Sequence, residues 1–354
     1  MSNQSISPGL RPTYPFEPIH GLPALSRALG IHRDMLIKYS QRADRLYRVA
    51  KQEKKADGTL RQTFDAFPVL KSIQIRIQQR ILKRIIYPAY LQGSLRGCSP
   101  RTNAAIHVHA KIAFAEDIAN FFPSAHYGLI KRIWTGFMGF SDDVAEVLAM
   151  LTTKDGGLPQ GAVTSSFLAN LVFWDYEPFL VEKLDARGLR YSRYVDDVSV
   201  SCVQRLQVED QSRLVSEIYG MLLHHGFKPK RSKHEVFTAG KSMRTTKLLS
   251  NKRVALPVEQ RQNIRAAVYA LEKQIASGDC GATVAKELAR VASRVGRLGS
   301  FHSKEATALK TRLKTVRRAL DPVPIPTKGE DAQDPKEEIV KTCLPPPWGK
   351  SIQA

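Results

Sequence analysis

Apolar residues recur every three or four positions through the first part of the chain, which is the spacing of one face of an α-helix. This spacing predicts helices over residues 22–29, 34–50 and 72–90. Residues 1–20 are rich in Pro and Ser and lack such a period, so we expect a flexible N-terminal arm there.

The central part of the chain alternates between strand and helix patterns. The predicted elements are, in order, a strand over 111–117, a helix after Pro123, a helix over 145–151, a long helix over 161–184, two strands joined by a turn over 189–202, and a helix over 208–225. Asp196 and Asp197 fall in that turn, between apolar strand residues. The pattern therefore predicts two neighbouring carboxylates at the tip of a hairpin.

The last third of the chain is mainly helical in pattern. Two short strands are predicted around 236–237 and 247–249. Three helices follow, over 258–277, 282–297 and 303–320. Pro recurs from residue 321 onward, so we expect a disordered Pro-rich tail over 321–354.

Composition adds a large positive charge to this picture. Lys and Arg total 54 against 33 Asp and Glu, a formal net charge of +21, which predicts a polyanionic partner. The chain has no uninterrupted apolar span of about 20 residues and no apolar signal segment, so we expect a soluble cytoplasmic protein without membrane contact. Its four scattered cysteines suggest neither a zinc site nor a disulfide framework.

Three carboxylates stand out as candidates for chemistry. Hairpin turns favour Asn-Gly or Asp-Gly, and the neighbouring Asp196 and Asp197 repel each other unless a cation neutralises them. Asp117 ends an apolar strand. Nucleotidyl transfer needs two hard divalent ions held by carboxylate oxygens, and these residues could supply that set. An ordinary exposed acidic turn is the alternative.

The sequence around these carboxylates resembles reverse transcriptases, and within them the bacterial retron-type group. The residues that carry the resemblance stand in family order. They are the fingers residues Arg61, Pro68, Leu70, Lys71 and Gln74; the signature Asn103, Ala104 and His107; the palm runs 117–124, 157–162 (followed by Ser165, Leu168, Ala169 and Asn170) and 194–197; and Gly226 with Lys233.

The resemblance implies an α+β class chain with a right-hand polymerase fold. Fingers and N-terminal helices are expected over 21–110, a palm with a ferredoxin-like antiparallel sheet over 111–245, and a helical thumb over 246–320. The implied activity is RNA-directed DNA polymerase. The implied setting is a retron that copies a structured non-coding RNA in bacterial anti-phage defence.

The resemblance also implies cofactors, partners and metal ligands. The cofactors are two Mg²⁺ ions, with Mn²⁺ as a substitute. The partners are an RNA template and primer, dNTPs, the DNA product or RNA–DNA hybrid, and an effector protein. Asp117 and Asp196 would hold the ions, with Asp197 as the less direct ligand and the carbonyl of Ile118 completing the shell.

Four further residues receive roles at the nucleotide. Phe122 would exclude a 2′-hydroxyl, with a core phenylalanine as the alternative, since only one of Phe121 and Phe122 can face the site. Gln160 would bond a nucleotide or template sugar, or else cap a helix. Arg61 would bind the triphosphate, unless it is a surface cation. Lys233 would protonate the leaving pyrophosphate, unless it belongs to a basic nucleic-acid rail.

The resemblance assigns RNA contact to a further set of residues, of which Asn103 and His107 could instead brace the palm. Thr246, Lys247 and Asn251 stand where retrons carry a Val-Thr-Gly motif, and Lys replaces its Gly. This departure leaves open a related defence reverse transcriptase that is not a retron. Val195 and Phe122 argue against an RNA-templated RNA polymerase, and the intact aspartates argue against a non-catalytic RNA-binding protein of polymerase fold.

Overall fold

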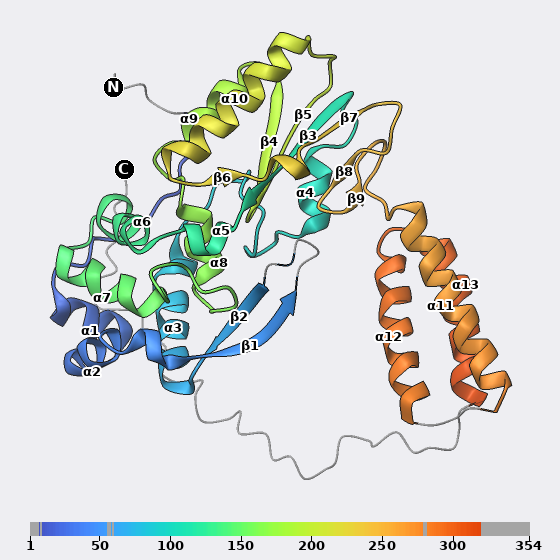
Figure 1. Cartoon of the computed structure of the whole chain (residues 1–354), viewed down its shortest axis with the longest axis horizontal. Helices are drawn as coiled ribbons and strands as arrows, with labels where there is room; N and C mark the ends of the chain where they lie inside the picture. The colour runs from blue at the N-terminus through green and yellow to red at the C-terminus, as the bar shows by residue number, and fades with distance from the viewer. Residues whose placement is uncertain (1–6, 8, 55–57, 59, 279–281, 320–354) are drawn as a thin grey trace. The chain divides into compact units, whose positions relative to one another are not determined.

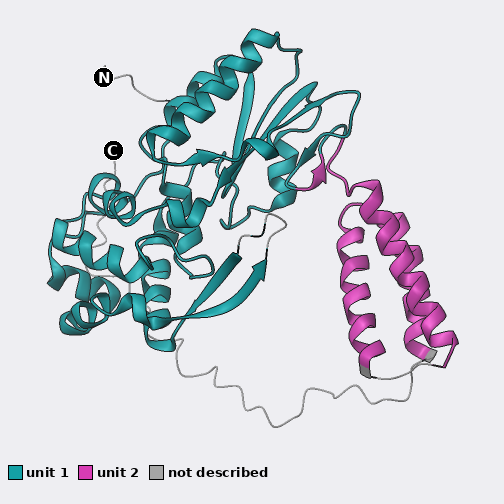
Figure 2. Cartoon of the chain, in the orientation of Figure 1, with its two compact units in different colours: residues 1–246, 250–252 teal, residues 247–249, 253–354 magenta. Residues whose placement is uncertain are grey.

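The structure of the protein is a computed structural model that describes residues 7, 9–54, 58, 60–278 and 282–319. The chain divides into two compact units, residues 1–246 with 250–252 and residues 247–249 with 253–354 (Figure 2). Helices and antiparallel sheets share the first unit, so the predicted α+β class is confirmed. The tail expected over 321–354 lies outside the described residues. No described helix is both long and apolar enough to span a bilayer.

A five-stranded antiparallel sheet forms the centre of the first unit (Figure 1). The strands run in the order β4-β5-β3-β6, and β7 also pairs with β3. They are β3 (Ile112–Ala119), β4 (Leu189–Tyr194), β5 (Asp197–Cys202), β6 (Lys228–Pro229) and β7 (Glu235–Thr238). Because β3 has paired strands on both edges and is buried along most of its length, Asp117 stands at the end of a fixed strand.

Helices pack against this sheet and complete the core. α9 (Glu177–Asp185) contacts β4, and α10 (Val208–His224) contacts β6 and α9. α8 (Ser165–Leu171) precedes α9 as a separate helix, so the long helix predicted over 161–184 is wrong. Pro178 in the first turn of α9 explains the break, because proline cannot donate the hydrogen bond that a helix interior needs.

The first unit contains a further group of helices and short helical turns. Its members are α1 (Leu22–Leu29), α2 (Arg33–Ser40), α3 (Pro68–Arg80), α4 (Pro100–Ile106), α5 (Phe121–Ser124), α6 (Tyr127–Arg132) and α7 (Asp142–Thr152), with short turns η1 (Ala43–Leu46), η2 (Leu82–Arg84), the π-helical η3 (Ile133–Phe137) and η4 (Arg231–Lys233). α3 ends well before the predicted residue 90. The helix expected over 145–151 is confirmed within α7.

The described part of the N-terminal segment packs onto the unit instead of forming a free arm. Leu10 and Tyr14 are half-buried against the core, and Thr13 forms a bridge with Ile86. Arg11 lies over the ring of Phe179, with 4.9 Å between its guanidinium carbon and the ring centre. The expectation of a flexible arm is therefore wrong for residues 9–20.

A two-stranded hairpin replaces the end of the helix predicted over 34–50. β1 (Tyr47–Lys54) pairs antiparallel with β2 (Leu60–Ala66). Only the first residue of β1 is buried, and its charged residues also favour helices, so the local pattern does not reveal the strand. Pairing with β2 decides the structure.

The second unit contains a bundle of three helices. α11 (Val258–Ala276), α12 (Ala282–Gly299) and α13 (Ser303–Ala319) match the predicted helices closely. Val268, Val291 and Leu309 are among their buried residues. Arg312 forms a paired ion contact with Glu272 between α13 and α11. Two short strands, β8 (Arg244–Thr245) and β9 (Leu248–Leu249), precede the bundle.

Candidate active site

The sheet brings the three predicted carboxylates together at one end. Asp117 and Asp197 are register partners in the antiparallel β3 and β5 pair. Asp196 lies in the turn before β5, and its carbonyl accepts a hydrogen bond of 3.1 Å from the backbone N–H of Ile118. Residues 80 positions apart in sequence are thus fixed at one point by backbone pairing.

Burial and mutual repulsion change the ionisation of these carboxyl groups. Burial and the charges of Asp196 and Asp117 together raise the pKa of Asp197 to about 7, against the attraction of Lys233. Burial also raises the pKa of Asp196, and the charge of Asp117 adds to this. Near neutral pH the site therefore carries unrelieved negative charge and a proton that Asp197 readily holds.

Lys233 forms an ion pair with the first carboxylate. Its Nζ lies 2.9 Å from Oδ2 of Asp117, and its side chain is 55% exposed. Burial lowers the pKa of Lys233, but its hydrogen bond to Asp117 and the nearby aspartate charges outweigh this and leave the pKa raised. Lys233 is therefore a cation at the point where a metal ion would meet Asp117.

The segment that carries Lys233 is tied to the same strand. His234 Nδ1 lies 2.6 Å from a carboxylate oxygen of the buried Glu116, and the hydroxyl of Tyr219 donates to the other oxygen at 3.1 Å. The backbone N–H of Lys230 donates to the carbonyl of Asp117 at 2.7 Å. These contacts hold η4 beside the end of β3.

A cleft of about 760 Å³ is lined by Asp117 and Asp196. Its wall combines carboxylates with cations, which suits a nucleoside triphosphate and its counterions. The cationic lining residues are Lys54, Arg61, Lys154, Lys230 and Lys233. Lys54, Lys154 and Lys230 were missed by the sequence analysis, because surface lysines on separate elements carry no motif.

Arg61 and Gln160 meet at the cleft. Nε of Arg61 donates to the side-chain oxygen of Gln160 at 3.2 Å, and the N–H of Phe64 in β2 donates to the backbone carbonyl of Gln160 at 2.8 Å. A Cβ on Gly161 would lie 2.7 Å from the carbonyl oxygen of Phe64, so only glycine permits this close approach. Gln160 does not cap α8, whose N-cap is Thr164.

Phe121 and Phe122 have different environments. Phe121 is buried and its ring stacks on Phe227 with 5.2 Å between ring centres. Phe122 is half-buried at the edge of the core, and both residues line the cleft. The backbone N–H of Leu158 donates to the carbonyl of Phe122 at 3.1 Å, which fixes this segment beside the Gln160 loop. The role of Phe122 at the sugar stays a prediction.

His107 and Asn103 are fully buried, which favours the bracing role over the alternative of contact with RNA. The ring nitrogens of His107 lie 2.8 Å and 2.7 Å from the hydroxyls of Ser201 and Ser192, and burial lowers its pKa to about 3. His107 thus braces β4 and β5 as a neutral residue. The amide atoms of Asn103 have no hydrogen-bond partner among the described residues.

The residues at the expected retron motif form a tight turn. Thr246 and Lys247 have φ angles of 46° and 64°, and the hydroxyl of Thr246 donates to the carbonyl of Pro100 at 3.0 Å. The amide of Asn251 bonds to the backbone of Met243 and Lys241. Asn251 therefore stabilises this segment through its side chain, and RNA contact by Thr246 and Lys247 stays a prediction.

The sequence analysis also missed a buried ion pair beneath the catalytic turn. Arg193 and Glu177 are both buried, and Arg193 Nε lies 2.6 Å from a Glu177 oxygen. An Arg beside the predicted turn and a Glu at the start of a helix were available as signals. Only the fold shows that they meet.

Comparison with known proteins agrees with this geometry. The chain is 32% identical over 268 residues to the retron Se72 reverse transcriptase of Salmonella heidelberg, which covers 75% of this chain and 71% of that protein. It is 29% identical over 331 residues to the retron Ec48 reverse transcriptase of Escherichia coli, covering 89% of this chain and 79% of the relative. No family model matches the chain.

Among solved structures, telomerase from Candida albicans in complex with a fragment of telomeric RNA aligns with 58% of this chain and 40% of its own, at 9% identity and a TM-score of 0.38. A similarity this low supports no argument. The curated relatives do, because identity and coverage are high for the first of them. The chain belongs to the retron reverse transcriptase family and is an RNA-directed DNA polymerase.

Proposed function

We propose that this polymerase copies a dedicated structured RNA into DNA by nucleotidyl transfer at Asp117, Asp196 and Asp197. The observation that carries the proposal is that Asp117 and Asp196 line a cleft that also contains Arg61 and Lys233, with Asp197 paired to Asp117 in the sheet. A cleft lined by both carboxylates and cations suits a triphosphate and its counterions. An RNA-binding protein without activity would gain nothing from this costly burial of like charges.

Two divalent ions, Mg²⁺ in the cell, are the proposed cofactor. No group of three or more His, Cys, Asp or Glu in the described chain is arranged to hold a metal ion as it stands. The donor set nevertheless fits a hard cation, because all its members are carboxylates and the raised pKa values of Asp196 and Asp197 reflect charge that a cation would relieve. Asp117 and Asp196, with the Ile118 carbonyl, are the proposed ligands. When bound, the ions activate the attacking hydroxyl and hold the triphosphate.

The surrounding residues have proposed roles in binding. Arg61 contacts the triphosphate, and Gln160 orients it or the template sugar from the loop pinned to β2. Phe122 lies against the sugar and excludes a 2′-hydroxyl. Lys233 donates a proton to the leaving pyrophosphate. For this step the Lys233 ammonium must first break its ion pair with Asp117. Each role matches a residue that lines the same cleft.

The subdomain assignment is part of the proposal. The central sheet with α8 to α10 would be the palm, and the β1 and β2 hairpin with the N-terminal helices would be the fingers. The three-helix bundle would be the thumb, and its division from the first unit near residue 246 supports this assignment. We further propose action in the bacterial cytoplasm in anti-phage defence, with an effector protein, in line with the retron names of its relatives.

The test is to sequence the nucleic acid that copurifies with the full chain. The wild-type protein should carry one abundant structured RNA together with DNA complementary to part of it. A matched Asp117→Asn protein, nearly identical in shape, should carry the RNA without the DNA. Random cellular RNA on both proteins, or the same DNA on both, would contradict the proposal.

A further inference from the structure

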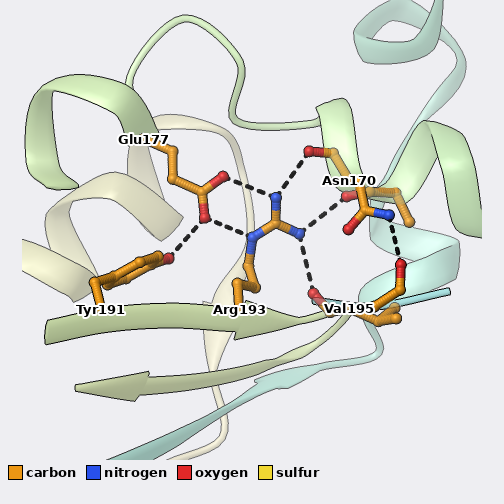
Figure 3. Close-up of polar contacts among 7 residues, drawn as sticks. Asn170, Glu177, Tyr191, Arg193 and Val195 are labelled. Carbon is orange, nitrogen blue, oxygen red and sulfur yellow. Dashed lines mark hydrogen bonds and ion pairs between the residues drawn. The ribbon is translucent and has the colours of Figure 1, made fainter. Parts of the chain in front are cut away.

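The side chain of Arg193 is completely buried. It bonds to Val195, which begins the turn that carries Asp196 and Asp197, and to Glu177 and Asn170 (Figure 3). Each of its five N–H donors has an acceptor. The acceptors are both carboxylate oxygens of Glu177 and the backbone carbonyls of Ala169, Asn170 and Val195. Burial alone would lower the pKa of Arg193, but the charge and hydrogen bonds of Glu177 raise it above its usual value. Arg193 is therefore a permanent cation joining α8, α9 and the turn.

The turn that Arg193 supports has an unfavourable backbone. Val195 has a φ of 61°, a region that β-branched residues rarely adopt. Strain of this kind persists only where the surroundings hold it. The guanidinium donates to the Val195 carbonyl at 3.1 Å, and Ile118 donates to the Asp196 carbonyl at 3.1 Å. The carbonyl groups of Val195 and Asp196, which belong to the two peptide bonds of Asp196, thus each accept one hydrogen bond.

A second contact closes on Val195 from a different segment. A Cβ on Gly93 would lie 2.5 Å from Cγ2 and 2.6 Å from the backbone nitrogen of Val195. The Gly93 carbonyl accepts a hydrogen bond of 2.8 Å from the side chain of Asn170, whose own carbonyl accepts from Arg193. The same network therefore holds the segment that packs against the turn.

We propose that Arg193 is a positioning residue for nucleotidyl transfer, which fixes Asp196 and Asp197 relative to Asp117 through the Val195 carbonyl. Glu177 is its counterion. This inference rests on the proposed function of the three carboxylates. Arg193 and Glu177 would neutralise each other without any contact to the turn. A role in stability alone therefore does not explain the hydrogen bond from Arg193 to the Val195 carbonyl.

Two variants separate positioning from stability. The combination of Arg193→Met, Glu177→Met and Tyr191→Phe removes the three polar side chains that meet in the ion pair. Tyr191 is included because its hydroxyl donates to Glu177. Apolar replacement of a buried ion pair often leaves stability unchanged. Arg193→Lys keeps a positive charge beside Glu177. The lysine ammonium lacks the planar guanidinium that bonds to Glu177 and to the Val195 carbonyl at the same time. The control is Arg187→Met with Glu217→Met, a pair 2.7 Å apart that does not touch the turn.

The readouts are primer extension on a defined RNA template, Mn²⁺ binding to the enzyme–hybrid complex by EPR, hybrid affinity and thermal unfolding. We expect kcat to fall about 100-fold in the combined variant and in Arg193→Lys, since a misplacement near 1 Å costs about that much. The KM for dNTP and the hybrid affinity should stay near wild type, and Mn²⁺ should bind more weakly. The control should keep the wild-type kcat.

Wild-type kcat and Mn²⁺ affinity in the combined variant would overturn the inference. If that variant does not fold, Arg193→Lys decides in the same way. Failure of the proposed function gives a different result. In that case the wild-type enzyme and the double variant Asp196→Ala with Asp197→Ala would have the same activity. The inference fails only when the wild type is active, the aspartate variant is not, and the Arg193 variants remain fully active.

Discussion

Asp117 and Asp197 face each other across the β3 and β5 pair, and Nζ of Lys233 lies 2.9 Å from Oδ2 of Asp117. Backbone pairing brings the two carboxyl groups close enough that their repulsion adds to burial in raising the pKa of Asp197 to about 7. The energetic cost of this arrangement is reasonable for a site that binds cations. It would serve no purpose in a purely structural hairpin.

Replacing Phe122 by Ala should increase ribonucleotide incorporation relative to deoxynucleotide incorporation. In the proposed role the ring excludes the 2′-hydroxyl by its volume, and the variant leaves the proposed metal ligands and Arg61 in place. Overall efficiency should fall, because the ring also contacts the sugar. Competition between each dNTP and its rNTP on one RNA template measures the ratio.

Phe121→Ala is the matched control for the sugar gate. Phe121 is buried and packs against Phe227 and Phe173, so its removal should destabilise the fold by about 3–5 kcal/mol and lower both activities together. An unchanged nucleotide ratio in Phe122→Ala, with a large loss of stability, would show that Phe122 is a core residue.

Gly93→Ala should impair catalysis as well as stability. The new Cβ would overlap the backbone nitrogen of Val195 and shift the catalytic turn, at a cost of about 1–3 kcal/mol. We expect a fall in kcat of about 10- to 100-fold. Gly220→Ala in α10 is the control, because its Cβ would meet no described atom within 4 Å and should slightly stabilise the helix. Equal activity of the two variants would contradict the close approach of Gly93.

His107 should make the protein sensitive to acid. Its folded-state pKa is about 3, while an unfolded histidine has a pKa near 6.5. Below pH 6.5 the unfolded chain binds a proton that the folded protein does not, so this residue lowers the free energy of unfolding as the pH falls. At pH 5.5 the loss should be about 1.4 kcal/mol relative to pH above 7.

His107→Gln tests this, because glutamine does not titrate. Urea unfolding at pH 7.5 and 5.5 should show a smaller loss of stability on acidification in the variant than in the wild type. Asp197 contributes the opposite trend in both proteins, because its raised pKa makes the folded state bind a proton first as the pH falls. An identical pH dependence of the two proteins would show that His107 is charged or exposed.

The sequence predicts elements with a strong apolar period and a buried face. α11 was predicted over 258–277 and extends from 258 to 276, because its apolar residues follow helical spacing. The strands around Asp196 are likewise confirmed. β1 was missed because its residues are mostly exposed and polar, and its conformation depends on a partner strand. Local pattern carries no information on such pairing.

The site shows the same division. The carboxylates, Arg61 and Gln160 follow from motifs with fixed spacing, and the structure brings Asp117, Asp196, Arg61 and Gln160 to one cleft. The burial of His107 and the contact between Arg193 and Glu177 depend on which faces of β4 meet α4 and α9. Those faces are set by tertiary packing.

Binding to RNA or to an RNA–DNA hybrid should weaken steeply with salt. The net charge of +21 predicts many phosphate contacts, and each one lowers the logarithmic salt slope by about 0.7 to 0.9. Replacing the exposed Lys310 and Lys314 of α13 by Ala should make the salt slope shallower if α13 contacts the phosphate backbone of the nucleic acid. Fluorescence anisotropy at several KCl concentrations gives the slope, and a flat response would assign the charge to another purpose.

The central claim is that Asp117, Asp196 and Asp197 perform RNA-directed DNA synthesis. The most direct measurement is dNTP incorporation on a primed RNA template by the wild type and by Asp196→Ala with Asp197→Ala, alongside hybrid affinity and thermal unfolding. Removing repelling buried carboxyl groups should leave folding and RNA binding intact. We predict that incorporation disappears in this variant, and incorporation at the wild-type rate would contradict the account.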